Sequence, residues 1–268
     1  MSDVFLLTGC ASGIGRHLAG ALSGLGHKVL ATDVNEAGLL EAAKGWKGEN
    51  VKTFVLDVRD RARWEAALAV TLQHFGKLDV LLNIAGYLKP GWSWEITTAD
   101  VDRHLDINVK GVIYGVHVVG KHFVEQKRGH IINIGSLASL APVPGLGLYS
   151  SSKFAVRGFT LAAAQELAPH GVKVTLVMPD AVETPMLDLQ VDCEQAAMTF
   201  SGPKALTVED IERALLDVVL PEAPLELPIP FSRGAMARLA TLLPAAVVKL
   251  GPLFVKLGKR AQARRKKN

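Results

Sequence analysis

The chain has 268 residues, of which 49% are hydrophobic and 21% are charged, a size and composition typical of one soluble domain with a substantial core. Its two cysteines, Cys10 and Cys193, exclude a disulfide framework and favour a reducing compartment. The first residues lack the basic start of a secretory signal, and no segment approaches the roughly 18 apolar residues that span a bilayer. We therefore expect a cytoplasmic protein.

The net charge of +4 is a property of the C-terminal end rather than of the whole chain. Ten of the 30 basic residues, and none of the 26 acidic ones, lie between Arg233 and Asn268. The part before Arg233 therefore holds 20 basic and 26 acidic residues, a net charge of −6. We expect no nucleic-acid partner, because surfaces that bind nucleic acid are basic.

Short apolar runs alternate along the chain with longer amphipathic or alanine-rich stretches. The runs are rich in leucine or β-branched residues and predict strands covered on both faces, at 4–9, 28–33, 52–58, 78–86, 129–136 and 172–179. The stretches between them predict helices over 13–24, 37–44, 62–76, 100–125 and 150–170, the last capped by Gly171. This alternation predicts a single α/β domain built on a doubly wound parallel sheet.

The first predicted strand runs into the sequence TGCASGIG (8–15), a GxxxGxG turn that opens the first predicted helix. Glycines at these positions allow a tight turn and let a diphosphate approach the backbone, while the helix N-terminus adds free N–H groups. Glycine-rich turns also occur without any ligand, but a place between the first strand and the first helix is the context that dinucleotide binding requires. The sequence therefore predicts a dinucleotide site at this turn.

Acidic residues follow the second and third predicted strands. Asp33 lies 18 residues after Gly15, where a carboxylate accepts hydrogen bonds from both ribose hydroxyls of an adenosine and repels a 2′-phosphate. This position predicts NAD, with NADP less favoured, although Asp33 could instead cap the turn before Asn35, and Arg16 beside the glycine loop weighs toward NADP. Asp57 is placed to accept the adenine amino group.

Several further motifs stand in one order along the chain and together resemble the short-chain dehydrogenase/reductase family, in its branch of roughly 250 residues. The resemblance covers residues 4–220 and rests on TGCASGIG (8–15), Asp57-Val58, NIAG (83–86), Asn108 in INVKG, Ser136 in INIGS, YSSSK (149–153) and PDAVETPM (179–186). It implies a Rossmann-type sheet, a nicotinamide cofactor, chemistry between a secondary alcohol and a carbonyl, and a homodimer or homotetramer.

Two positions depart from the family pattern. Ile84 stands where the family usually has a second asparagine, and Asp180 stands where it usually has glycine. The first position mainly supports the central strand. Asp180 adds a carboxylate near the expected nicotinamide end of the site, and the sequence offers no reason for it.

Tyr149 and Lys153 of YSSSK lie four residues apart, so a helix places them on one face, about 5–6 Å apart at Cβ. A free tyrosine has a pKa near ~10 and is a weak base at neutral pH. An ammonium about 4 Å from the phenolate would stabilise it by up to about 4 kcal/mol, or about three pKa units. The pair could instead decorate an exposed helix face, but Ser136 and Asn108, which are also in register with the family, favour catalysis.

The resemblance implies the following roles. Tyr149 is the acid and base, Ser136 hydrogen-bonds the substrate oxygen, and Lys153 lowers the tyrosine pKa and binds the nicotinamide ribose. Asn108 holds a water that relays protons. The residues expected to bind the cofactor are Gly9, Ser12, Gly13, Ile14, Gly15, Asp33, Asp57, Val58, Asn83, Ala85, Gly86, Tyr149, Lys153, Val182 and Thr184.

The substrate end of the site is expected between the loop before Tyr149 and a segment of poor periodicity at 187–206, which is predicted to fold over the substrate as a lid. Their side chains indicate an apolar substrate, unless they are ordinary packing residues: Met186, Leu187, Leu189, Met198 and Phe200, with Val143, Pro144 and Leu146 opposite. We expect residues 1–226 to form the dinucleotide-binding and catalytic domain.

Residues 227–268 form an extension that is first apolar and then basic, and Pro244, Lys249, Gly251 and Pro252 are expected to break it into short pieces. Through residues 233–268 it could lie on an anionic membrane surface as a peripheral anchor. Alternatively, its apolar part packs on the body or on a partner subunit.

Two further functions remain alternatives to the enzyme. The chain could be a non-catalytic NAD-binding sensor, or a scaffold that works at a membrane surface through its basic tail. The presence of both Tyr149 and Lys153 favours the enzyme. No metal site is expected, because the histidines are scattered along the chain and only His117 and His122 are close in sequence.

Overall fold

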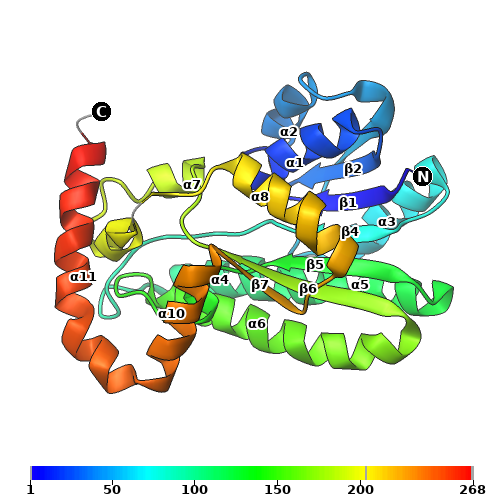
Figure 1. Ribbon diagram of the computed structural model, residues 1–268. Coiled ribbons are helices and arrows are strands. Elements are labelled where there is room, and N and C mark those ends of the chain that lie inside the picture. The colour runs from blue at the N-terminus through cyan, green and yellow to red at the C-terminus, as the bar shows by residue number, and fades with distance from the viewer. Residues whose placement is uncertain (1, 203, 267–268) are drawn as a thin grey trace.

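The computed structural model describes residues 2–202 and 204–266, which form a seven-stranded parallel sheet with helices on both faces (Figure 1). The strands lie in the order β3-β2-β1-β4-β5-β6-β7, which confirms the predicted doubly wound sheet. Their bounds are β1 Val4–Thr8, β2 Lys28–Asp33, β3 Val51–Val55, β4 Val80–Asn83, β5 Gly129–Ile134, β6 Val172–Pro179 and β7 Glu226–Ile229.

The helices follow the strands in the alternation that the sequence predicts. They are α1 Gly13–Gly24, α2 Glu36–Ala43, α3 Arg61–Phe75, α4 Thr98–His104, α5 Gly111–Gln126, α6 Gly147–Leu167, α7 Pro185–Asp188, α8 Val208–Ala214, α9 Leu220–Glu222, α10 Phe231–Leu242 and α11 Pro244–Arg265. Short turns add 3-10 segments at η1 Gly48–Asn50, η3 Leu137–Ser139, η4 Ala168–His170 and η5 Glu194–Ser201, and π-helical segments at η2 Leu105–Lys110 and η6 Leu215–Val219.

Alternate residues of the central strands face two separate cores. Leu6 of β1 packs in the core covered by α3, α5 and α6, whereas its neighbours Phe5 and Leu7 pack in the core covered by α1 and α2. Because side chains of a strand point alternately to the two faces, a strand covered on both sides needs apolar residues at every position. This explains the continuous apolar runs in the sequence.

The seventh strand, β7, is absent from the sequence-based expectation. Its residues pair in parallel with the end of β6, from Leu176 with Glu226 to Pro179 with Ile229. The strand is short, lies at the edge of the sheet and contains Pro228, so it has neither the length nor the composition by which a strand is recognised. The expected division between residues 226 and 227 therefore falls inside a strand of the main sheet.

The C-terminal extension forms a helical hairpin of α10 and α11, so the expectation of short broken pieces is wrong (Figure 1). Pro252 lies inside α11 on its exposed side. A proline inside a helix costs about 3 kcal/mol, and the packing of α11 along η5 offsets this. The Gln262 amide donates to the carbonyl oxygens of Gln190 (2.9 Å) and Cys193 (2.8 Å).

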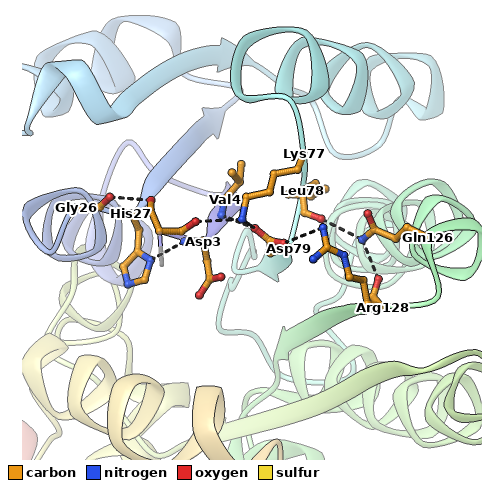
Figure 2. A network of polar contacts seen from close by, with 10 residues as sticks. Asp3, Val4, Gly26, His27, Lys77, Leu78, Asp79, Gln126 and Arg128 are labelled. Carbon is orange, nitrogen blue, oxygen red and sulfur yellow. Dashed lines mark hydrogen bonds and ion pairs between the residues drawn. The ribbon is translucent and has the colours of Figure 1, made fainter.

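Polar contacts join the N-terminal ends of β1, β4 and β5 (Figure 2). Asp79, just before β4, accepts a hydrogen bond from the backbone N–H of Val4 at 2.9 Å and lies 2.7 Å from the Lys77 ammonium. Gln126 donates to the carbonyl oxygens of Leu78 (3.1 Å) and Arg128 (2.8 Å). These bonds fix the relative height of the three strands, and therefore the height at which their opposite, carboxyl ends meet.

None of the helices in residues 2–202 and 204–266 combines the length and the apolar character that crossing a bilayer requires.

Candidate active site

A cavity of about 900 Å³ opens at the carboxyl ends of the strands, beside the point between β1 and β4 where the strand order reverses. Open α/β sheets bind ligands at such a reversal point. Most of the residues expected from the sequence line this one cavity: Gly9, Ser12, Gly13, Ile14, Gly15, Asp33, Asp57, Val58, Ala85, Gly86, Ser136, Tyr149, Lys153, Val182 and Thr184. Asn83 and Asn108 are buried behind its wall.

The glycine loop after β1 needs its glycines for space and for backbone conformation. Gly9 has φ +75° and Gly13 has φ +52°, conformations that residues with a Cβ rarely adopt. A Cβ on Gly15 would lie 2.2 Å from the carbonyl oxygen of Gly9, which is impossible without movement of the loop. The loop and the start of α1 are therefore closely packed, as a diphosphate-binding turn requires.

Thr8, which the sequence analysis did not single out, joins the glycine loop to the end of β4. Its buried hydroxyl accepts the backbone N–H groups of Ile84 and Ala85, both at 3.0 Å. In the sequence, the place of Thr8 at the start of TGxxxGxG was the sign of a role for this residue, but only the structure shows which backbone N–H groups its hydroxyl binds.

Asp33 at the end of β2 fixes the glycine loop as well as facing the cavity. One carboxylate oxygen accepts the backbone N–H of Ala11 at 2.9 Å, and the other accepts that of Asn35 at 2.8 Å. The capping role and the ribose-binding role considered for Asp33 are therefore compatible, because a carboxylate oxygen has lone pairs for more than one donor.

Asp57 after β3 is held by Arg59 rather than left free for a ligand. The guanidinium donates to Asp57 through Nε at 2.9 Å and through a terminal nitrogen at 2.6 Å. This hydrogen bonding holds the pKa of Asp57 below its ordinary value, against the opposing effect of burial. Arg59 also lines the cavity beside Asp57, and the acceptance of an adenine amino group by Asp57 stays a prediction.

Asn83 supports the central strands from inside the fold. Its amide donates to Asn133 Oδ1 on β5 at 2.8 Å, and the Asn133 amide donates to Thr160 Oγ1 on α6 at 2.9 Å. Since its side chain does not line the cavity, any contact with a cofactor must come from its backbone.

Asn108 lies in the π-helical segment η2, which interrupts what the sequence analysis took for one helix over 100–125. Its Oδ1 accepts the backbone N–H of Tyr87 at 2.7 Å, and its Nδ2 donates to the Tyr87 carbonyl at 2.9 Å and to Ser152 Oγ at 2.9 Å. Single π-helical turns cluster at functional sites. Here the turn brings an amide from the α4–α5 region against the helix that carries Tyr149 and Lys153.

Burial, more than mutual attraction, sets the protonation of Tyr149 and Lys153. The Lys153 ammonium donates to the carbonyl of Ile134 at 2.8 Å and lies 5.6 Å from the centre of the Tyr149 ring. Loss of hydration lowers the pKa of Lys153 to about 8. Burial likewise raises the pKa of Tyr149 to about 12, against the opposing hydrogen bond with Ser136.

The sequence-based expectation of a lowered tyrosine pKa is wrong in direction, because burial outweighs the effects that favour the phenolate. The phenol is therefore protonated at neutral pH.

The substrate end of the cavity is lined mostly by apolar side chains from several parts of the chain. They include Met186 just before the lid, Leu187 and Met198 of the lid, and Val143 and Leu146 of the loop before α6. The expected Leu189 is exposed and does not line the cavity. Phe200 and Pro144 also lie outside the lining. The hairpin supplies an unforeseen wall: Met236, Ala237, Leu239, Ala240, Leu243, Val247, Leu250 and Phe254.

The depressed pKa of Lys153 predicts a pH dependence of stability. Between a folded pKa of about 8 and the ordinary value of 10.5, the unfolded chain keeps a proton that the folded chain has lost, so stability from this group rises with pH. Relative to Lys153→Met, the free energy of unfolding of the wild type should rise by about 2 kcal/mol between about pH 7 and pH 10. Urea denaturation at each pH measures this.

Lys121→Met, at an exposed position on α5, controls for the loss of one positive charge. Parallel stability curves for the wild type and Lys153→Met would contradict the depressed pKa.

The sequence profile of the short chain dehydrogenase family matches residues 3–194. The chain is 38% identical over 218 residues to an NADP-dependent 3-hydroxy acid dehydrogenase, YdfG, of Salmonella typhi, covering 79% of this chain and 87% of that protein. It is 38% identical over 189 residues to a 3-alpha-(or 20-beta)-hydroxysteroid dehydrogenase of Mycobacterium tuberculosis, covering 70% and 72%.

Among solved structures, a short chain dehydrogenase/reductase from Burkholderia phymatum in complex with NAD superimposes with a TM-score of 0.81 at 26% identity, over 93% of this chain and 95% of that one. The family match covers most of the chain, and the fold and the relatives agree with it. The chain therefore belongs to the short chain dehydrogenase family, oxidoreductases that use a nicotinamide cofactor and act on CH–OH groups.

Proposed function

We propose that the protein is an NAD-dependent oxidoreductase that interconverts a secondary alcohol and a carbonyl on an apolar substrate. The observation that carries this proposal is that Ser136, Tyr149 and Lys153 line the same cavity as the glycine loop. One cavity therefore joins a proton donor, a hydrogen-bond donor for an oxyanion and a dinucleotide turn.

In this proposal Tyr149 moves the proton of the reacting oxygen. Its raised pKa of about 12 keeps it protonated at neutral pH, the form that donates to a carbonyl oxygen in reduction. Oxidation requires the phenolate, which the positive charges of Lys153 and of an oxidised nicotinamide both favour. The bound nicotinamide supplies the chemistry of hydride transfer.

Ser136 and Asn108 are given supporting roles. The Ser136 hydroxyl donates to the substrate oxygen and stabilises developing negative charge. A Cβ placed on Gly86 would lie 3.5 Å from Asn108 Oδ1 and 3.9 Å from Lys153 Nζ. The absence of a side chain there supports a relay water between Lys153 and Asn108.

The preference for NAD is proposed on the position of Asp33, whose carboxylate faces the cavity at the end of β2. The residues proposed to hold the cofactor are those of the cavity lining named above, with Val182 and Thr184 at the nicotinamide end. Against NAD stands the NADP-dependent relative YdfG. A carboxylate at this position disfavours a 2′-phosphate by charge.

The apolar substrate is proposed from the lining of the cavity beyond Tyr149. The lid at 187–206 and the extension from residue 227 both contribute to it, so we propose that the C-terminal extension completes the catalytic domain. The hydroxysteroid dehydrogenase relative fits an apolar substrate. A homodimer or homotetramer and a cytoplasmic location remain predictions.

Tyr149→Phe should abolish turnover while leaving cofactor binding intact, because it removes only the proton that the reaction moves. We expect kcat to fall by about 100- to 10,000-fold. Oxidation is measured as NADH formation with isopropanol, cyclohexanol, menthol and a hydroxysteroid, and reduction as NADH consumption with the corresponding ketones. NADH binding is measured by fluorescence titration. Tyr114→Phe, in a tyrosine packed against the core, is the matched control.

Wild-type binding of NADH without turnover of any alcohol or ketone would favour a non-catalytic NAD-binding sensor instead. Equal turnover by the wild type and Tyr149→Phe would overturn the role given to Tyr149.

Asp33→Asn should shift the cofactor preference toward NADP. The amide oxygen still accepts the Ala11 N–H, but the charge that repels a 2′-phosphate is lost. The ratio of kcat/KM with NAD to that with NADP should favour NAD in the wild type and fall by at least about tenfold in the variant. A wild type that prefers NADP would overturn the assignment.

A second role, contact with an anionic membrane surface, is proposed from the outer face of the hairpin. Leu242 at the end of α10 is 75% exposed, and Val248 and Leu253 of α11 are 77% and 55% exposed. The basic residues exposed on α11 are Lys249, Lys256, Arg260 and Arg264. No acidic residue occurs between Phe231 and Arg265. Exposed apolar side chains among basic ones suit the interface of an anionic bilayer.

Vesicle sedimentation tests this role. The wild type should pellet with phosphatidylserine-containing vesicles and stay in solution with pure phosphatidylcholine, and Lys256→Glu/Arg260→Glu should weaken binding at least about tenfold. Lys121→Glu/Lys173→Glu, which reverses two exposed lysines of the body, is the control. Equal vesicle binding by the two double variants would overturn this role. So would a dimer that forms through the hairpin in a protein that does not bind vesicles.

A further inference from the structure

The residue that the sequence left unexplained, Asp180, forms an ion pair with Arg233 inside the cavity. Asp180 is the first residue after β6, and Arg233 lies in the first turn of α10. Arg233 Nε contacts Asp180 Oδ2, and the two side chains are only 24% and 15% exposed. Burial raises the pKa of Asp180, and the charge of Arg233 opposes this rise.

The pair stands where three segments of the chain meet. The backbone N–H of Asp180 donates to the carbonyl of Ile229 at 2.8 Å, extending the pairing of β6 with β7. A Cβ on Gly202, at the end of the lid, would lie 3.2 Å from Arg233 Nη1 and 3.5 Å from Asp180 Oδ2. The loop after β6, the lid and the hairpin are thus all in contact with this ion pair.

Both arms of the hairpin hold the loop after β6. Arg233 of α10 holds its start at Asp180, while Arg265 at the end of α11 pairs with Glu183 and Asp188. The Arg265 pairs are more exposed than the Asp180–Arg233 pair, and exposed ion pairs contribute little. Removing one partner of a less exposed pair costs more, because the other charge is then left poorly hydrated.

Arg233 shares one face of α10 with part of the apolar wall. Arg233, Met236, Ala237 and Ala240 all line the cavity, and their spacing of three, four and seven residues places them on one face of the helix. A rotation or shift of the first turn of α10, where Arg233 forms its ion pair, would therefore displace every side chain of this face.

We propose that Arg233 is a positioning residue that, through Asp180, couples the C-terminal hairpin to the loop bearing Val182 and Thr184 and so sets the fit of bulky apolar substrates. This inference rests on the proposed function. A small alcohol would contact only the Ser136 and Tyr149 end of the cavity, whereas a bulky one would also need the wall of α10.

The test compares Arg233→Ala, Arg233→Lys and Asp180→Gly with the control Arg238→Ala. Arg238 lies on the same helix but pairs with Glu226 at 3.0 Å, outside the cavity lining. We expect Arg233→Ala and Asp180→Gly to raise the KM for menthol about tenfold. In both variants the KM for isopropanol, and the kcat for either alcohol, should change less than about twofold. Arg233→Lys keeps the charge and should therefore have a KM for menthol close to that of the wild type, and Arg238→Ala should match the wild type.

Amide hydrogen exchange supplies a readout that needs no turnover. In Arg233→Ala, residues 180–188 and α10 should exchange at least about tenfold faster, with β4 unchanged, and Arg238→Ala should show no such change. Three results for Arg233→Ala would each overturn the proposal. They are an exchange rate equal to that of the wild type, an equal loss of kcat for both alcohols, and a KM for menthol equal to that of the wild type. If the wild type turns over neither alcohol, the proposed function fails with these alcohols and the exchange result alone decides the coupling.

Discussion

The close approach of two backbones at the carboxyl edge of the sheet is the constraint on which the rest of the site depends. A Cβ on Gly9 would lie 3.0 Å from the Ala85 Cα, so the turn after β1 and the end of β4 meet with room for almost no side chain. The Thr8 hydroxyl holds them together by accepting both N–H groups of the β4 end. A crevice lined by backbone amides at the reversal of strand order is the general binding place of this architecture.

Burial then decides the chemistry that this crevice can perform. Lys153 and Tyr149 are withdrawn from water, and each is pushed toward its neutral form, the lysine to a pKa of about 8 and the tyrosine to about 12. At neutral pH Tyr149 is therefore a proton donor rather than a base. Charge brought into the cavity by a ligand acts there with little screening, so the proton affinity of Tyr149 is open to control by what binds beside it.

The C-terminal hairpin is both a wall of the cavity and the most basic part of the chain. Its inner side reaches the lid through Gln262, and through Gly258, where a Cβ would lie 1.9 Å from the Ala197 carbonyl oxygen. Its outer side leaves apolar and basic residues exposed. In the two proposed roles, an apolar substrate and a membrane surface would contact different side chains of the same two helices.

The sequence by itself determined the sheet, the order of its first six strands along the chain, and the family. Apolar runs buried on both faces differ from amphipathic helices in their periodicity, and glycines and the YSSSK spacing are local signals. Two elements were not predicted from the sequence because their local signals are weak. β7 is a short edge strand that contains a proline, and the π-helical turn at Asn108 interrupts a pattern that reads as one continuous helix.

Only the tertiary structure decided the electrostatics of Tyr149 and Lys153, the partner of Asp180 and the course of the hairpin. Each depends on residues that are distant in sequence or on the depth to which a side chain is buried. Asp180 and Arg233 are 53 residues apart in the chain, and neither carries a local pattern that names the other. Desolvation, likewise, is a property of the whole packed molecule rather than of any short segment of it.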